Sequence, residues 1–193
     1  MADDGPENVE AMRLGKLEFA LMNNPLRRLL QRKVEFGAFL SFLEQQRIDL
    51  TGKVIMDAGC GSGYSTELIL EQLRPARLMA FDLMPEQIRL ARRRGLPVDF
   101  RVGDLTRIDC PDAACDAVFV FGVLHHIPEW RLALAELRRV LKPGGVLLAE
   151  EPEYRFRWTE LVAGIEEAGL KIVEYRPIYG GYFHTYLCRR VAS

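Results

Sequence analysis

Val54-Ile55-Met56-Asp57-Ala58-Gly59-Cys60-Gly61-Ser62-Gly63 is the stretch of this 193-residue chain that decides its fold. Three apolar residues lead into an acid, and glycine then occupies every second position. An apolar run that ends in Asp and glycines predicts a buried strand that enters a tight turn. Residues 64–73 carry apolar side chains at helical spacing, so a helix should follow. Glycines let the loop backbone approach a ligand closely and point its N–H groups at it.

The spacing of the glycines separates two kinds of nucleotide site. A dinucleotide fingerprint reads Gly-x-Gly-x-x-Gly and holds a pyrophosphate at a helix N-terminus. Here the third glycine comes one residue early, at Gly59, Gly61 and Gly63. This segment resembles the first motif of the class I S-adenosylmethionine-dependent methyltransferases, whose cofactor has no phosphate. The resemblance implies a doubly wound α/β fold, with a mostly parallel seven-stranded sheet, a C-terminal antiparallel hairpin and helices on both faces.

Composition and charge restrict the class of protein. With 49% hydrophobic residues, the chain suits a single methyltransferase domain over residues 1–193. The net charge of −1 argues against nucleic acid as a partner. We find no signal peptide and no apolar run near the roughly eighteen residues of a spanning helix, so we expect a cytoplasmic protein. The four cysteines form no Cys-x-x-Cys pair, and we expect reduced thiols and no metal site.

Residues 7–46 precede the Rossmann-like core, which we expect over residues 50–190. Their apolar positions recur at helical spacing and are interrupted at Asn23-Asn24-Pro25, which predicts two amphipathic helices. They resemble the lid that many of these methyltransferases place over the cofactor, and Phe19, Met22 or Asn23 would then approach the methyl group. The helices are also rich in Lys and Arg, so peripheral contact with a membrane surface is the alternative. We favour the lid, because any packed helix needs an apolar stripe.

The expected cofactor site follows the strand ends. The first motif contributes Asp57, Gly59, Cys60, Gly61 and Gly63. Asp82 ends a second strand over residues 77–82, 19 residues beyond Gly63, and its carboxylate suits the two ribose hydroxyls. An N-cap for the helix that starts at Pro85 is the alternative role for Asp82. The resemblance also implies contacts from Leu83, from Gly103-Asp104-Leu105 with adenine, and from Phe121 and Gly122 with the methionine part of the cofactor.

His125 and His126 follow the fourth expected strand, over residues 113–121, and are the catalytic candidates. Histidine titrates near neutral pH, so either ring could accept the proton of a hydroxyl acceptor. A histidine that only hydrogen-bonds backbone at a helix start is the alternative, because His-His-Ile-Pro recurs in relatives with different substrates. His184, on the last expected strand (182–190), is a weaker candidate.

The acceptor itself is not named by the sequence. The carboxyl end of the fifth expected strand (146–150) carries three acids, Glu150, Glu151 and Glu153. Charges at such a position are usually solvated. Two adjacent carboxylates could instead hold a cationic or hydroxylated substrate. An apolar pocket could be lined by the aromatic residues Tyr154, Phe156, Trp158, Tyr179 and Tyr182. We expect S-adenosylmethionine as cofactor, S-adenosylhomocysteine as product, and an O, N or C nucleophile of a small molecule as acceptor. An RNA or protein acceptor, or a non-catalytic partner protein, are the alternatives, and the oligomeric state stays open.

Overall fold

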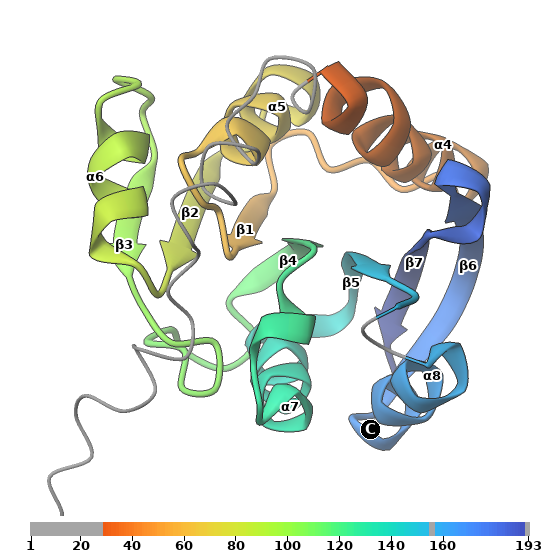
Figure 1. Ribbon diagram of the computed structural model, residues 1–193. Helices are drawn as coiled ribbons and strands as arrows, with labels where there is room; N and C mark the ends of the chain where they lie inside the picture. The colour runs from red at the N-terminus through yellow and green to blue at the C-terminus, as the bar shows by residue number, and fades with distance from the viewer. Residues whose placement is uncertain (1–28, 155–156, 192–193) are drawn as a thin grey trace, which may run out of the picture.

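A computed structural model of the chain describes residues 29–154 and 157–191. It contains one seven-stranded sheet with the strand order β3-β2-β1-β4-β5-β7-β6 (Figure 1). The strands are β1 Val54–Ala58, β2 Arg77–Asp82, β3 Asp99–Val102, β4 Cys115–Phe121, β5 Leu141–Pro152, β6 Leu170–Ile178 and β7 Phe183–Arg190. The helical segments are η1 Gln31–Glu35, α4 Phe36–Gln45, α5 Tyr64–Leu73, α6 Pro85–Arg92, η2 Leu124–His126, α7 Trp130–Val140, α8 Trp158–Glu167 and η3 Tyr179–Gly181.

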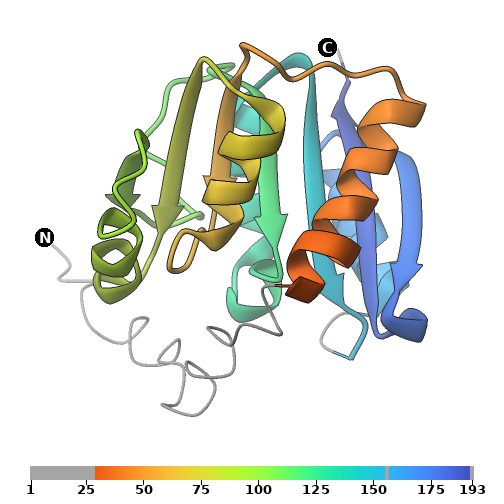
Figure 2. The ribbon, with the colours of Figure 1, turned by 90° about the horizontal axis from the view of Figure 1, so that it is seen from above.

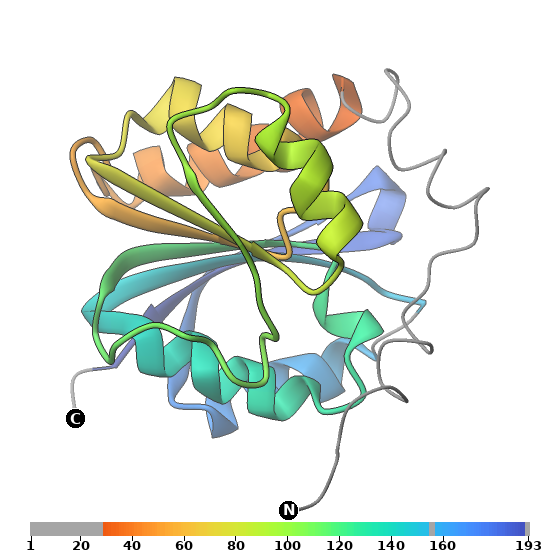
Figure 3. The same cartoon turned by 90° about the vertical axis from the view of Figure 1, so that its left-hand side faces the viewer.

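The sheet lies between two layers of helices. Figure 3 shows α4, α5 and α6 on one side of the sheet and α7 and α8 on the other. Strands β1 to β5 pair in parallel, whereas β7 is antiparallel to both β5 and β6. The predicted doubly wound, mostly parallel sheet with its C-terminal hairpin is therefore confirmed.

Side-chain alternation along β4 explains why this strand is apolar at nearly every position. Val118 packs in the core against α7 and α8, whereas Phe119 packs with Phe36 and Phe39 of the opposite layer. A strand that is covered by helices on both faces needs apolar residues on both. Phe119 is stacked on Phe36 at 6.1 Å between ring centroids, which fastens α4 to the middle of the sheet.

The order of the strands reverses between β1 and β4. The chain leaves β1 toward β2 on one side and leaves β4 toward β5 on the other, as the view in Figure 2 shows. The loops after these two strands diverge, so they leave a crevice beyond the carboxyl ends of the strands. Both the glycine loop and the His-His segment lie at this crevice.

Several boundaries differ from the sequence expectations. Strand β5 runs from Leu141 to Pro152, longer than 146–150, because Leu141 pairs with β4 while Glu151 and Pro152 pair with β7. The second N-terminal helix contains a π-helical turn, η1, before α4. The first N-terminal helix and the lid residues Phe19, Met22 and Asn23 lie outside the described residues.

Candidate functional site

The three glycines of the loop after β1 meet different surroundings. All three have positive φ, at +82°, +52° and +80° for Gly59, Gly61 and Gly63. A Cβ at Gly59 would lie 2.3 Å from Cγ2 of Val123, so the loop packs directly on the segment after β4. A Cβ at Gly61 would meet nothing within 4 Å. Gly59 therefore brings two loops together, and Gly61 leaves space open.

Asp57 is completely buried behind this loop. Its Oδ2 accepts hydrogen bonds from the hydroxyls of Ser65, at 2.7 Å, and Thr66, at 2.6 Å. Burial raises the pKa of Asp57 to about 6, and the two hydroxyls oppose part of that rise. The carboxyl group joins the end of β1 to the first turn of α5, so Asp57 fixes the glycine loop from behind.

Asp82 supports the same loop from β2. Its Oδ2 accepts the N–H of Gly61 at 2.8 Å, and its Oδ1 accepts the N–H of Met84 at 2.9 Å. Burial raises the pKa of Asp82, and these two N–H groups oppose the rise. The N-cap position of α6 belongs to Met84, with no side-chain cap bond, so Asp82 is not the N-cap residue. Each carboxylate oxygen keeps a lone pair for a further donor.

The segment after β3 comes next to Asp82. Gly103 donates its N–H to the carbonyl oxygen of Asp82 at 3.0 Å. The Asp104 side chain is exposed, and its Oδ1 accepts both the N–H and the hydroxyl of Thr106 at 2.8 Å. The Leu105 side chain is buried in the core, so a ligand would meet its backbone.

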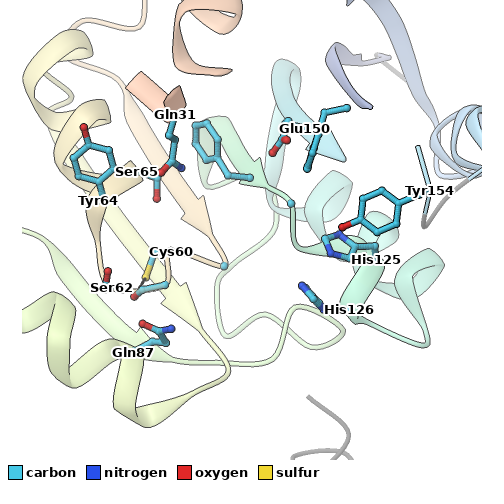
Figure 4. Close-up of a pocket in the computed structure, with 15 residues that line it drawn as sticks. Gln31, Cys60, Ser62, Tyr64, Ser65, Gln87, His125, His126, Glu150 and Tyr154 are labelled. Carbon is cyan, nitrogen blue, oxygen red and sulfur yellow. Dashed lines mark hydrogen bonds between the residues drawn. The ribbon is translucent and has the colours of Figure 1, made fainter. Parts of the chain in front are cut away.

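A cavity of about 210 Å³ lies between the glycine loop and the carboxyl ends of β4 and β5 (Figure 4). Seven predicted site residues line it: Gly59, Cys60, Gly61, Phe121, Gly122, His125 and His126. Seven others are not among its lining residues: Asp57, Gly63, Asp82, Leu83, Gly103, Asp104 and Leu105. The second group lies behind the loop or at the ends of β2 and β3.

Some lining residues were not predicted as site residues. Ser62 lies within the glycine motif and Tyr64 and Ser65 follow it directly, and this adjacency is a signal that could have found them. Gln31, Gln87 and Phe183 also line the cavity, from η1, α6 and β7. These three come from distant parts of the chain, and no local pattern marks them.

The two adjacent glutamates at the end of β5 are buried, which corrects the expectation that such charges are solvated. Glu150 is 0% exposed and Glu151 is 1% exposed. Neighbouring residues of a strand point to opposite faces of the sheet, so these two carboxyl groups have different surroundings. Glu150 lines the cavity. Glu151 accepts the backbone N–H groups of the turn after β4.

His125 is held by Glu151. Its Nδ1 lies 2.8 Å from Oε2 of Glu151, and only 8% of its side chain is exposed. The rings of His125 and His126 lie 3.9 Å apart between centroids. Figure 4 shows His125 and Tyr154 across the cavity from Cys60, Ser62 and Gln87. The structure thus brings the predicted histidines to the cavity.

His184 belongs to a different cluster. It stacks on Tyr175, hydrogen-bonds the Tyr175 hydroxyl through Nδ1, and lies 2.9 Å from Glu153 through Nε2. It is not among the residues that line the cavity, which weakens it further as a catalytic candidate.

Most of the aromatic residues that were expected to line an apolar pocket lie elsewhere in the structure. Tyr154 lines the cavity, but the hydroxyl of Tyr179 bonds Glu35, and Trp158 packs against Tyr175. Tyr182 is 70% exposed, and Phe156 lies outside the described residues. Phe121, Phe183 and Tyr64 line the cavity together with Tyr154.

The described part of the chain offers no group of three His, Cys, Asp or Glu side chains that could hold a metal ion. Its four cysteines are unpaired thiols, and burial raises the pKa of each. Within the same residues, no helix is long and apolar enough to cross a membrane.

Comparison with known families agrees with this geometry. A family model described as a methyltransferase domain matches residues 56–149, from β1 to β5. The matched region, close to half of the chain, is a methyltransferase domain, and its relatives and its fold are those of class I S-adenosylmethionine-dependent methyltransferases.

Individual relatives of this methyltransferase domain come from several bacteria. A malonyl-[acyl-carrier protein] O-methyltransferase of Serratia marcescens is 40% identical over 97 residues, which cover 50% of this chain and 37% of that protein. A demethylmenaquinone methyltransferase of Thermus thermophilus is 34% identical over 131 residues, 64% of this chain and 59% of its own. The matches thus span roughly a third to three fifths of each relative. A solved methyltransferase structure from Aquifex aeolicus superposes with a TM-score of 0.75, at 21% identity, over 93% of this chain and 100% of its own.

Proposed function

We propose that this chain moves a methyl group from S-adenosylmethionine to an O, N or C nucleophile of a small molecule and releases S-adenosylhomocysteine. The observation that carries the proposal is the cavity between the glycine loop and the His125-His126 turn. The end of the cavity at the glycine loop suits a nucleoside-bearing cofactor, and the other end carries groups that can orient an acceptor. The named relative that acts on demethylmenaquinone supports a small-molecule acceptor.

The residues present fit the cofactor. Gly61 has open space where a Cβ would stand, which leaves room for a ligand against the loop. Asp82 lies beneath Gly61 and has lone pairs for ribose hydroxyls, with Gly103 hydrogen-bonded beside it. Asp104 and the backbone of Leu105 continue this surface and would meet adenine, while Phe121 and Gly122 would meet the methionine part. When bound, the cofactor supplies an activated methyl group on a sulfonium.

The chain itself has to position the acceptor, exclude water and take a proton where the acceptor carries one. Phe121, Tyr154 and Phe183 provide an apolar lining for the acceptor. His125 and His126 line the cavity and would accept its proton. Gln31 reaches the cavity from η1, which supports the proposal that the segment of residues 7–46 covers the site as a lid.

Calorimetry with three ligands tests the cofactor assignment. We expect S-adenosylmethionine and S-adenosylhomocysteine to bind and NAD not to bind, because the early third glycine leaves no pyrophosphate loop. Tight binding of NAD with no response to the other two would overturn the proposed function.

A further inference from the structure

Glu151 holds the turn after β4 with both carboxylate oxygens. Its Oε1 accepts the backbone N–H groups of Val123, at 2.9 Å, and Leu124, at 2.7 Å. Its Oε2 lies 3.3 Å from the backbone nitrogen of His125 and 2.8 Å from Nδ1 of that ring. At 1% exposure, this buried carboxylate is surrounded by groups that donate to it.

These contacts decide the tautomer of His125. An ionised carboxylate only accepts hydrogen bonds, so the Nδ1 atom that faces Oε2 must carry the proton. In a neutral imidazole the other nitrogen, Nε2, then has a free lone pair. Because His125 lines the cavity, this lone pair is available to an acceptor there.

The rest of the cavity indicates what kind of acceptor fits. Glu150 lines it as a buried carboxyl group, and Oε2 of Glu150 lies 3.5 Å from where a Cβ on Gly122 would stand. A carboxyl oxygen there accepts hydrogen bonds, so it favours an acceptor molecule that carries an O–H or N–H donor. Aromatic rings of Phe121, Tyr154 and Phe183 favour a flat apolar body.

We propose that Glu151 is a positioning residue which keeps Nε2 of His125 unprotonated, so that His125 takes the proton of an aromatic O–H or N–H acceptor. This inference rests on the proposed function. The oxygen or nitrogen of the acceptor bonds to the methyl carbon as the carbon–sulfur bond breaks, and the electron pair of that bond stays on sulfur. The proton of the acceptor moves to Nε2, and the imidazolium that results is stabilised by Glu151.

The substitution Glu151→Gln tests the tautomer directly. The amide oxygen of glutamine should take the place of Oε1, where two short N–H contacts hold it. The amide NH₂ then faces Nδ1 of His125 and donates to it, so the ring proton moves to Nε2. We expect nitrogen NMR of the imidazole to show an Nδ1-protonated ring in the wild type at about pH 8, where a free imidazole is neutral. In Glu151→Gln we expect the opposite tautomer.

The chain offers a matched control. Glu153, near the same end of the sheet, pairs with His184 rather than His125. The chain has three histidines, so their ring signals can be assigned one by one. Glu153→Gln should leave the His125 tautomer unchanged. An Nε2-protonated His125 in the wild type would overturn the proposal without any variant, and so would an unchanged tautomer in a folded Glu151→Gln.

Phenol and benzoate, added with S-adenosylhomocysteine, test the acceptor class. We expect phenol to shift the Nε2 signal of the wild type and benzoate to leave it in place. An equal or larger shift with benzoate, or none with phenol, would overturn the acceptor class. Calorimetric binding of S-adenosylhomocysteine to the wild type and to Glu151→Gln separates the two proposals. Intact binding with an unchanged His125 tautomer in Glu151→Gln refutes only this inference, whereas no binding to the wild type refutes the proposed function.

Discussion

The buried carboxyl group of Asp57 should make the unfolding free energy of the protein depend on pH. Its side chain is completely buried, and one oxygen, Oδ1, has no hydrogen-bond partner among the described residues. Burial raises its pKa from 3.8 to about 6. The folded protein therefore holds this proton more tightly than the unfolded chain does, and protonation of Asp57 stabilises the fold.

The size of the effect follows from the shift. One pKa unit corresponds to about 1.4 kcal/mol, so the whole shift is worth about 3 kcal/mol of unfolding free energy. That contribution is fully present below the unfolded pKa, and it is lost as the pH rises through about 6. Because proton binding is coupled to folding, about 1.4 kcal/mol of this contribution to the unfolding free energy is lost between pH 5 and pH 8.

Asp57→Asn removes this titration and keeps an oxygen that can accept from Ser65 and Thr66. We expect the unfolding free energy of the wild type, relative to that of Asp57→Asn, to fall by about 1.4 kcal/mol from pH 5 to pH 8. Urea unfolding of both proteins at the two pH values measures the difference.

An exposed acid supplies the control. The pKa of Asp49 is lowered by hydrogen bonds with Thr51, so Asp49 is ionised throughout the same interval. Asp49→Asn should leave the pH dependence of the wild type unchanged. A constant free-energy difference between the wild type and Asp57→Asn from pH 5 to pH 8 would refute the reasoning about burial.

Three further predictions concern the cofactor site. Gly59→Ala should lower the unfolding free energy by about 2 kcal/mol or more, because its Cβ would meet Val123 at 2.3 Å with φ at +82°. Gly61→Ala should cost only about 1–2 kcal/mol of stability but abolish binding of S-adenosylhomocysteine; urea unfolding and calorimetry distinguish the two variants, and equal losses in both would contradict the assigned roles. Asp82→Ala should weaken S-adenosylhomocysteine binding by about 1–3 kcal/mol in calorimetry and leave the protein folded, and normal binding by an unfolding-prone variant would contradict a ligand role. Finally, S-adenosylhomocysteine should slow hydrogen exchange in residues 7–30 if they form a lid, whereas protection by anionic vesicles alone would favour membrane contact.

Much of the site could be predicted where its residues adjoin a motif. The glycine loop, Phe121, Gly122 and the two histidines follow strand ends, and strand ends are marked by apolar runs that stop at acids or glycines. The parallel arrangement then brings these ends to one edge of the sheet. Gln31 and Phe183 could not be found in this way, because they reach the cavity from segments 94 and 57 residues from the His-His turn.

The acids at the strand ends also divide into what the sequence could predict, their positions, and what it could not, their contacts. Sequence placed Asp57, Asp82, Glu150 and Glu151 at the carboxyl ends of strands, since strand patterns and their terminating acids are local features. Which of the two glutamate carboxyl groups lines the cavity was decided only by tertiary structure. Neighbouring residues of a strand face opposite layers, so Glu150 lines the cavity while Glu151 binds the turn after β4.

By itself, the amino-acid sequence determined the fold class, the order of the elements and the position of the glycine loop. These properties depend on the spacing of apolar residues and glycines along a few neighbouring turns or strands. Only the tertiary structure decided that Asp57 is buried behind the loop and that Glu151 fixes the ring of His125. The hydrogen-bond partners are 8 positions apart for Asp57 and Ser65 and 26 positions apart for His125 and Glu151. Such partners come into contact only when the sheet and its helices pack together.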